Sequence, residues 1–333
     1  MSVNDDAQQP TRNLAMELVR ATEAAALAAG RWMGRNEKEA GDQAAVDAMR
    51  LMLSQVEMDG VVVIGEGEKD EAPMLYNGEA VGTGAAPQMD VAVDPIDGTR
   101  LLAQGRPGSL AVLALSPRGT MLDPGPMVYM EKWVVGADAI GAVDIDAPIR
   151  ENVRRVAAAK GKQPSDLTVM MLDRPRHEAM MAEVRATGAR LQLLMDGDVA
   201  AGLLALLPEE PIDLLLGIGG TPEGVILGCA VHALGGEMRG RLWARDDAEA
   251  ERAAELGFDI DQQLDTDDLV SSEDTFFACT GITPGDLVAG VTYAPRGAVT
   301  DSLVMRGKSG TVRWIRARHT FDKLMEYSAI EFA

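Results

Sequence analysis

The run Ile212-Asp213-Leu214-Leu215-Leu216 leads directly into Gly217-Ile218-Gly219-Gly220-Thr221-Pro222-Glu223. The apolar run predicts a buried strand, and the glycines predict a loop after it. A helix is predicted from Pro222 to Leu234, because Thr221 can cap it, proline suits the first helical position and Gly235 can end it. Strand, glycine loop and helix in this order are typical of one βα unit in an α/β protein.

Similar units precede this one along the chain. Strands are predicted at residues 167–172 and 190–194, and helices at residues 177–187 and 198–207. Strands that alternate with helices indicate parallel pairing. The first half is predicted to hold helices at 11–29 and from Asp42 onward, and strands at 61–64, 90–94, 110–115 and 130–135, with Pro95 ending the second of these strands. Residues 245–274 read as an exposed acidic helix and loop, and the last 60 residues as β-rich.

Composition narrows the class of protein. The chain has 333 residues, 47% of them hydrophobic, and 52 acidic against 31 basic residues, for a net charge of −21. That apolar fraction excludes a long disordered protein, and the length indicates two lobes. The negative charge disfavours nucleic acid and anionic membranes as partners. We expect the basic residues of the C-terminal region to pair with the acids of 245–274; they are Arg306, Lys308, Arg313, Arg316 and Arg318.

The rare residue types exclude further classes. Two cysteines and three histidines cannot build a disulfide framework, and they supply zinc or Ser-His-Asp chemistry poorly. No apolar run approaches the length of a membrane span, and the first residues lack the pattern of a signal peptide. A reducing, cytoplasmic location is therefore expected.

Chemically active residues cluster where the predicted strands end. In open α/β sheets such strand ends surround the ligand. Asp94 and Asp97 flank Pro95, and Gly98 permits a sharp turn that would aim both carboxylates at one point. Two carboxylates beside an anion-binding turn favour a divalent cation such as Mg²⁺, which prefers a few carboxylates together with phosphate oxygens.

The other strand ends each allow two interpretations. Glu66 and Glu68 form either a ligand pair or an acidic surface turn. Arg174 and Arg176 would bind phosphate through planar guanidinium groups or form surface ion pairs. Asp196 and Asp198 could accept from sugar hydroxyls or cap a helix. Glu223, in the first turn of its helix, and Asp42, as a helix cap, have equally ordinary structural explanations.

Taken together, these residues resemble a known family. The segments that carry the resemblance are residues 63–68, 71–76, 129–132, 174–177 and 196–201, Asp94-Pro95-Ile96-Asp97-Gly98-Thr99, and Gly217-Ile218-Gly219-Gly220-Thr221-Pro222-Glu223-Gly224. The hexapeptide is similar to the signature of the lithium-sensitive, metal-dependent phosphomonoesterases. The glycine segment is more specific and resembles class II fructose-1,6-bisphosphatases of the bacterial GlpX type. This resemblance implies an αβαβα sandwich of the sugar phosphatase type and a homodimer or homotetramer.

The resemblance also implies a role for each matching residue. Asp42 and Glu66 would bind one metal, and Asp94, Asp97 and Glu223 a second, with Mg²⁺ or Mn²⁺ as the ion. Some class II enzymes have Glu where this chain has Asp97, and the shorter side chain could shift the metal preference. The residues implied to face the substrate are Asp97, Gly98, Thr99, Tyr129, Arg174, Pro175, Arg176, Asp196, Gly197, Asp198 and Gly220. A metal- and phosphate-binding lobe is expected at 12–150 and a sugar-phosphate-binding α/β lobe at 151–333.

The implied reaction is hydrolysis of D-fructose 1,6-bisphosphate to fructose 6-phosphate and phosphate, a step of gluconeogenesis. Thr99 would orient the attacking water, and either Asp42 or Glu68 would accept its proton. Sedoheptulose 1,7-bisphosphate is an alternative substrate, alone or alongside the first, because it also presents a distal phosphate to the Arg pair. A remote alternative is a non-catalytic sugar-phosphate sensor.

Overall fold

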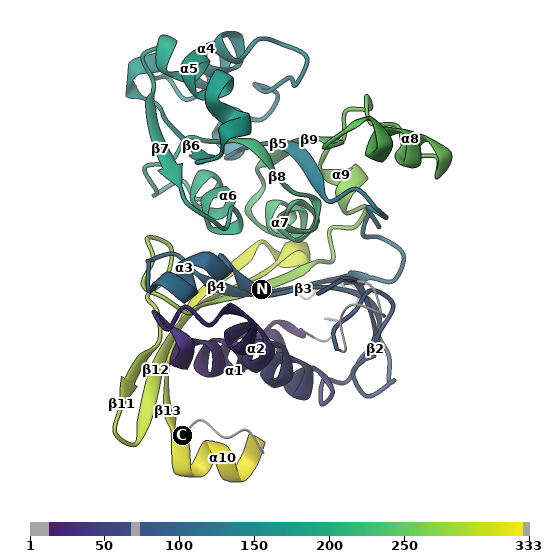
Figure 1. Ribbon diagram of the computed structural model, residues 1–333, viewed down its shortest axis with the longest axis vertical. Coiled ribbons are helices and arrows are strands. Elements are labelled where there is room, and N and C mark those ends of the chain that lie inside the picture. Colours follow the sequence, from purple (N-terminus) through teal and green to yellow (C-terminus); the bar gives the residue numbers. More distant parts are fainter. Residues whose placement is uncertain (1–12, 68–73, 329–333) are drawn as a thin grey trace, which may run out of the picture.

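The computed structural model describes residues 13–67 and 74–328 and arranges them in five layers (Figure 1). Helices α1 (Ala15–Ala29) and α2 (Lys38–Leu53) cover one face of an eight-stranded sheet. Helices α6 (Val199–Leu206) and α7 (Thr221–Leu234) lie between this sheet and a five-stranded one. Helices α4 (Ile149–Ala159) and α5 (Glu178–Ala186) cover the far face of the second sheet. The αβαβα sandwich expected from the resemblance is confirmed.

The first sheet joins segments from both ends of the chain. Its strand order is β11-β12-β10-β4-β3-β1-β2, with β13 on the other side of β12. Only β1 and β3 pair in parallel among these strands. The strands are β1 (Asp59–Ile64), β2 (Ala80–Val81), β3 (Gln88–Asp97), β4 (Leu110–Pro117), β10 (Phe276–Gly281), β11 (Thr292–Ala294), β12 (Gly297–Arg306) and β13 (Thr311–Thr320).

The second sheet has the order β7-β6-β8-β5-β9. Its parallel part consists of β6 (Thr168–Leu172), β7 (Arg190–Leu194) and β8 (Leu214–Gly220), which confirms the predicted βαβ units. Antiparallel pairing adds β5 (Tyr129–Val135) and β9 (Glu237–Trp243). The remaining α-helices of the described residues are α3 (Thr99–Gln104), α8 (Asp247–Glu255), α9 (Thr266–Leu269) and α10 (Phe321–Ser328).

Successive side chains of a strand point to opposite faces of its sheet, so each sheet contributes to a separate hydrophobic cluster on either side. On β5, Met130 and Val134 face the central helices, while Trp133 and Val135 face α4 and α5. On β4, Leu113 packs toward α1 and α2, and its neighbours point to the central layer. Burial on both faces explains why β4 is almost continuously apolar rather than alternating.

Three boundaries differ from the predictions. Strand β3 continues past Pro95 to Asp97, because the proline lies in a bulge where the ladder to β4 is already interrupted. Strand β8 continues through the glycines to Gly220, since their backbone pairs with β5. Helix α2 begins four residues before Asp42, which therefore lies inside the helix and is not its cap.

Sheet membership does not change at residue 150. Strand β5 lies before that residue and belongs to the second sheet, whereas β10 to β13 return to the first.

Pairing of the C-terminal basic residues with the acidic stretch is confirmed for Arg306 and Lys308, which both contact Asp274, at 3.2 and 3.7 Å. Within the described chain, the other three form no ion pair with that stretch; Arg313, Arg316 and Arg318 lie exposed on β13. No helix in the described ranges is both long and apolar enough to cross a membrane.

Candidate active site

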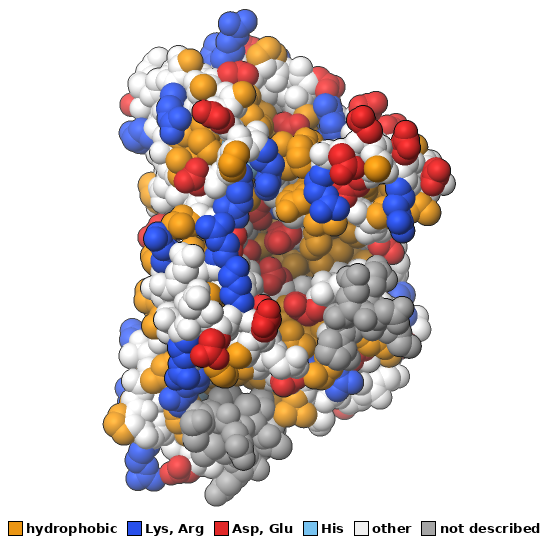
Figure 2. All heavy atoms as spheres, in the orientation of Figure 1, with side chains coloured by type: hydrophobic (Ala, Val, Ile, Leu, Met, Phe, Trp, Pro, Cys, Tyr) orange, Lys and Arg blue, Asp and Glu red, His pale blue; other side chains and the backbone are white. Residues whose placement is uncertain are grey.

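A cavity of about 410 Å³ opens between the two sheets. It is lined by the end of β3, the end of β8, the start of β5 and the first turns of α3 and α7. Figure 2 shows acidic side chains inside a hollow on this face, bordered by Lys and Arg side chains. The cavity therefore has an acidic interior beside a basic margin, as a metal-assisted phosphate site would require.

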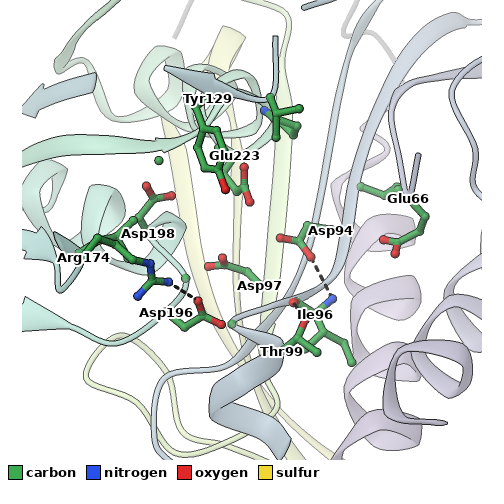
Figure 3. Close-up of a pocket in the computed structure, with 18 of the residues that line it drawn as sticks. Glu66, Asp94, Ile96, Asp97, Thr99, Tyr129, Arg174, Asp196, Asp198 and Glu223 are labelled. Carbon is green, nitrogen blue, oxygen red and sulfur yellow. Dashed lines mark hydrogen bonds and ion pairs between the residues drawn. The ribbon is translucent and has the colours of Figure 1, made fainter. Parts of the chain in front are cut away.

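A bulge in β3 brings Asp94 and Asp97 together. In a regular strand, residues three apart point to opposite faces. Here Asp94 pairs with Val112 and Asp97 with Leu110, so β3 has one more residue than β4 between these two pairs. The extra residue shifts the alternation of side chains between the two faces by one position. Both carboxylates consequently face the cavity (Figure 3), and the Asp94 carboxylate accepts from the Ile96 amide at 3.1 Å.

Glu223 completes an acidic cluster with these two aspartates. It lies in the first turn of α7 and points back over the end of β8. One carboxylate oxygen from each of Asp94, Asp97 and Glu223 lies within 4.8 Å of the others. Asp97 Oδ2 and Glu223 Oε2 are buried and have no hydrogen-bond partner. Unpartnered carboxylate oxygens that converge in this way fit a hard divalent cation.

The electrostatics of the cluster lead to the same conclusion. Burial raises the pKa of Asp94 well above its usual range, and the nearby Asp97 and Glu223 carboxylates raise it further. Burial, followed by Asp198 and Glu223, likewise raises the pKa of Asp97. The pKa of Glu223 is also raised, chiefly by burial. A cation among them would favour the ionised form of all three.

Asp42, Glu66 and Thr99 lie on the neighbouring side of this cluster. Burial raises the pKa of Asp42, and a hydrogen bond with the Thr99 hydroxyl partly opposes that rise. Glu66 reaches into the cavity, and the pKa of its carboxyl is raised to about 7 by desolvation, then by the Asp42 and Glu223 charges. The Thr99 hydroxyl also lies 3.2 Å from the Ile96 carbonyl oxygen.

The opposite wall carries the arginines. Arg174 donates to Asp196 at 2.6 Å and to the Met195 carbonyl, and Asp196 accepts in addition from the Arg100 amide. Arg176 donates to the Ile218 carbonyl at 2.7 Å, and its guanidinium lies 4.8 Å from the centre of the Tyr129 ring. Both guanidinium groups therefore have fixed positions along one side of the cavity.

His177 anchors this wall from behind. It is fully buried, its Nδ1 lies 2.7 Å from the Leu172 carbonyl oxygen, and its Nε2 accepts from the Ile218 amide at 2.8 Å. The neutral ring that this pattern requires is favoured because burial lowers the pKa of His177. The imidazole thereby joins the ends of β6 and β8 behind Arg176.

The glycines of β8 leave room for these side chains. A Cβ on Gly217 would lie 3.1 Å from the His177 ring, and one on Gly219 would lie 2.0 Å from Asp198 Oδ2. A Cβ on Gly220 would lie 1.7 Å from Glu223 Oε2. The glycine-rich segment is thus a strand that lets side chains cross its surface, and not a loop.

Most of the expected site residues meet in this cavity. Its lining includes Glu66, Asp94, Asp97, Gly98, Thr99, Tyr129, Arg174, Arg176, Asp196, Gly197, Asp198, Gly220 and Glu223. Asp42 lies behind Thr99, and Pro175 begins the short turn Pro175–His177 without lining the cavity. Glu68 falls outside the described residues.

Sequence reasoning gave no role to Lys132 or His177. Lys132 interrupts an apolar strand, and period-2 alternation places it on the same face as Met130 and Val134. A lysine on a buried face was the available signal. His177 had no comparable signal, because its two backbone partners lie on different strands.

Comparison with known proteins decides the family. The model of the bacterial, glpX-encoded fructose-1,6-bisphosphatases matches residues 12–319. The chain belongs to this fructose-1,6-bisphosphatase family. It is 46% identical over 325 residues to fructose-1,6-bisphosphatase 1 class 2 of Escherichia coli and to fructose-1,6-bisphosphatase class 2 of Shigella flexneri, covering 94% of this chain and 96% of each relative. Among solved structures, the extragenic suppressor protein SuhB of Bartonella henselae matches with a TM-score of 0.33 and 15% identity, over 58% of this chain and 74% of that one.

Replacing Gly220 with alanine tests how this fructose-1,6-bisphosphatase family member places Glu223. The new methyl carbon would lie 1.7 Å from Glu223 Oε2, so the carboxylate has to move from its position in the cluster. We expect Gly220→Ala to weaken Mn²⁺ binding, measured by titration calorimetry, roughly 10- to 100-fold, as changes that misorient a ligand do. Gly285→Ala is the control, since its Cβ would meet only ordinary contacts from 3.4 Å outward. Equal Mn²⁺ affinity in all three proteins would contradict the assignment of Glu223.

The raised carboxyl pKa values predict how stability depends on pH. Without a divalent cation, the folded protein binds more protons than the unfolded chain, so the free energy of unfolding falls as pH rises from about 4. For Glu66 this loss extends to a pH of about 7. Thermal unfolding at several pH values, with and without Mg²⁺, measures it; Mg²⁺ should flatten the decline because it binds the ionised cluster.

Asp94→Asn is the matched variant for this measurement. It removes one titrating group from the cluster and should reduce both the pH dependence and the response to Mg²⁺. Glu23, whose pKa burial raises to about 7 in a different part of the fold, should add a decline that Mg²⁺ does not change. An identical response to Mg²⁺ in wild type and Asp94→Asn would be the contrary result.

Proposed function

We propose that this protein hydrolyses D-fructose 1,6-bisphosphate to fructose 6-phosphate and phosphate, the reaction named for its relatives and the role expected in gluconeogenesis. The observation that carries the proposal is one cavity with a carboxylate cluster on one wall and two fixed arginines on the other. A bisphosphate needs both, because one phosphate must react while the other is held.

Asp94, Asp97 and Glu223 would hold Mg²⁺ or Mn²⁺, with Glu66 and Asp42 beside them. When bound, the cation would lower the pKa of a water and stabilise charge on the phosphoryl oxygens. The buried, unpartnered oxygens of Asp97 and Glu223 support this assignment. The sensor alternative has no comparable support, since the cavity combines this cluster with the Thr99 hydroxyl.

Thr99 would orient the attacking water, and Asp42 would accept its proton. The Thr99 hydroxyl can donate its one hydrogen either to the Ile96 carbonyl oxygen or to the neighbouring Asp42 carboxylate, so a lone pair on its oxygen can accept a hydrogen bond from water. Moving the proton through this pair leaves the water oxygen free to attack the phosphorus as the sugar oxygen departs. We prefer Asp42 over Glu68 as the proton acceptor because Asp42 lies beside Thr99 among the described residues.

Arg174 and Arg176 would bind the distal phosphate, and Tyr129, Asp196 and Asp198 the sugar. Arg174 uses one terminal nitrogen for Asp196 and the other for the Met195 and Asp173 carbonyl oxygens, and Arg176 uses two nitrogens for Ile218, which fixes both guanidinium groups without occupying every donor. Fixed donors lose little conformational entropy on binding phosphate.

Two free, buried cysteines fit a reducing compartment such as the cytoplasm.

The decisive experiment is phosphate release from fructose 1,6-bisphosphate, sedoheptulose 1,7-bisphosphate and fructose 6-phosphate, with Mg²⁺, Mn²⁺ or chelator. We expect release from the first substrate only with a divalent cation, and inhibition by Li⁺. Asp94→Asn should lower kcat at least 100-fold, by roughly the factor that loss of one transition-state contact causes. Comparable rates on both bisphosphates would indicate dual specificity.

A negative result in the same assay is equally informative. Tight binding of fructose 1,6-bisphosphate without phosphate release would favour the sensor. Full activity of Asp94→Asn would contradict the proposed metal site. The surface substitution Arg154→Ala controls for handling of the protein, because Arg154 does not line the cavity and, among the described residues, forms an exposed ion pair with Glu151.

We further propose that the protein forms a homodimer or homotetramer. In the described chain, β13 is an edge strand of ten residues, and its Trp314 is 53% exposed. Long exposed edges with aromatic side chains favour association. Light scattering after size exclusion should give at least twice the chain mass, and Trp314→Lys should lower that mass. A monomer at micromolar concentration would contradict the proposal.

A further inference from the structure

Lys132 is a lysine in the interior of the protein. It lies on β5, on the face shared with Met130 and Val134, and only 1% of it is exposed. Taking an ammonium group out of water is expensive unless it is paired and hydrogen-bonded. The acceptors of its ammonium group therefore indicate the role of this lysine.

Two acceptors from different elements meet its ammonium group. Lys132 Nζ donates to Asp198 Oδ1 at 2.9 Å and to the Gly220 carbonyl oxygen at 2.9 Å. Asp198 lines the cavity directly before α6, and Gly220 ends β8 directly before α7. One ammonium group thus joins β5, the start of α6 and the start of α7, the helix that carries Glu223.

The pair is built into the strand beside it. A Cβ on Gly219 would lie 2.0 Å from Asp198 Oδ2 and 2.8 Å from Lys132 Cε. No other residue type leaves that space, so the missing side chain of Gly219 and the buried ion pair belong to one arrangement. Asp198 is itself only 5% exposed and therefore has little freedom to turn elsewhere.

Charge adds a second argument. Burial and the Asp198 carboxylate raise the pKa of Asp97, and the positive charge of Lys132 opposes that rise. Lys132 lowers the pKa of Glu223 in the same way, against the larger effect of burial. The charge of Lys132 therefore acts on Asp97 and Glu223 as well as on its ion-pair partner Asp198.

We propose that Lys132 is a positioning residue for sugar recognition, which holds the Asp198 carboxylate at the cavity wall and fixes its place relative to the start of α7. This inference rests on the proposed function and extends it to a residue that does not line the cavity. Its side chain acts through Asp198 and does not touch the substrate.

The test compares wild type, Lys132→Met, Asp198→Asn and the double variant, with fructose 1,6-bisphosphate at saturating Mg²⁺. Methionine preserves the length and packing of the side chain while removing its donors. Lys132→Met should raise KM roughly 10- to 100-fold, the range expected for a lost hydrogen bond between charged groups, with a much smaller change in kcat. Mn²⁺ binding without substrate should change far less than KM.

Lys160→Met is the matched control. Lys160 is also largely buried and pairs with Asp138 at 2.8 Å and with Asp213 at 3.6 Å, but it lies at the end of α4, away from the cavity lining. This variant should lose stability without a change in KM. A purely structural role of Lys132 would give the same pattern in Lys132→Met and would overturn the proposal.

The double variant separates positioning from stability. Lys132→Met leaves Asp198 buried without its partner, whereas the double variant removes both charges and should regain stability. Its KM should match that of Asp198→Asn alone, because the proposed effect of Lys132 on sugar binding passes through that carboxylate. Additive KM effects would overturn the proposal, and this comparison remains available if Lys132→Met does not fold. If wild type releases phosphate from no sugar bisphosphate, the proposed function has failed and not this inference.

Discussion

Carboxylates that are buried beside one another repel, and the rest of this site is arranged around that constraint. Asp94, Asp97 and Glu223 converge from two different elements, although burial and mutual repulsion both oppose their ionisation. The backbone must hold them together without help from attraction among them. A bulge does so for the two aspartates, and a glycine at the end of β8 does so for the glutamate.

Much of the fold was predictable because strands buried on both faces are recognisable as apolar runs. The runs at 110–115 and 167–172 are buried strands and were found where expected, as was the helix ending at Gly235. Clustering of charged residues at strand ends also located the cavity, since parallel strands deliver their ends to one edge. Prediction failed where one residue served two purposes. Pro95 is a strand breaker by propensity and a bulge residue here, and the glycines of β8 resemble a loop although their backbone completes a ladder.

Lys132 and His177 escaped prediction for a different reason. Each is defined by partners distant in sequence, and no local pattern specifies them. His177 also clarifies the glycines: Gly217 faces its ring, Gly219 faces the Lys132–Asp198 pair and Gly220 faces Glu223. Side chains with different roles thus pack against the glycines of β8, where no side chain of the strand itself is in the way. The most recognisable segment of the sequence thus owes its composition to what packs on it.

The return of the last strands to the first sheet has a consequence for how the chain is made. Strand β4 has an apolar sequence and pairs on one side with β10, which lies more than 150 residues later in the chain. During synthesis, the half of the sheet that carries Asp94 and Asp97 therefore emerges with an open apolar edge, and only the final segment closes it. Such long-range pairing folds slowly and exposes an edge that other chains can join. The acidic cluster also joins residues from two distant segments, so a growing chain holds all three of its carboxylates only once α7 has been synthesised.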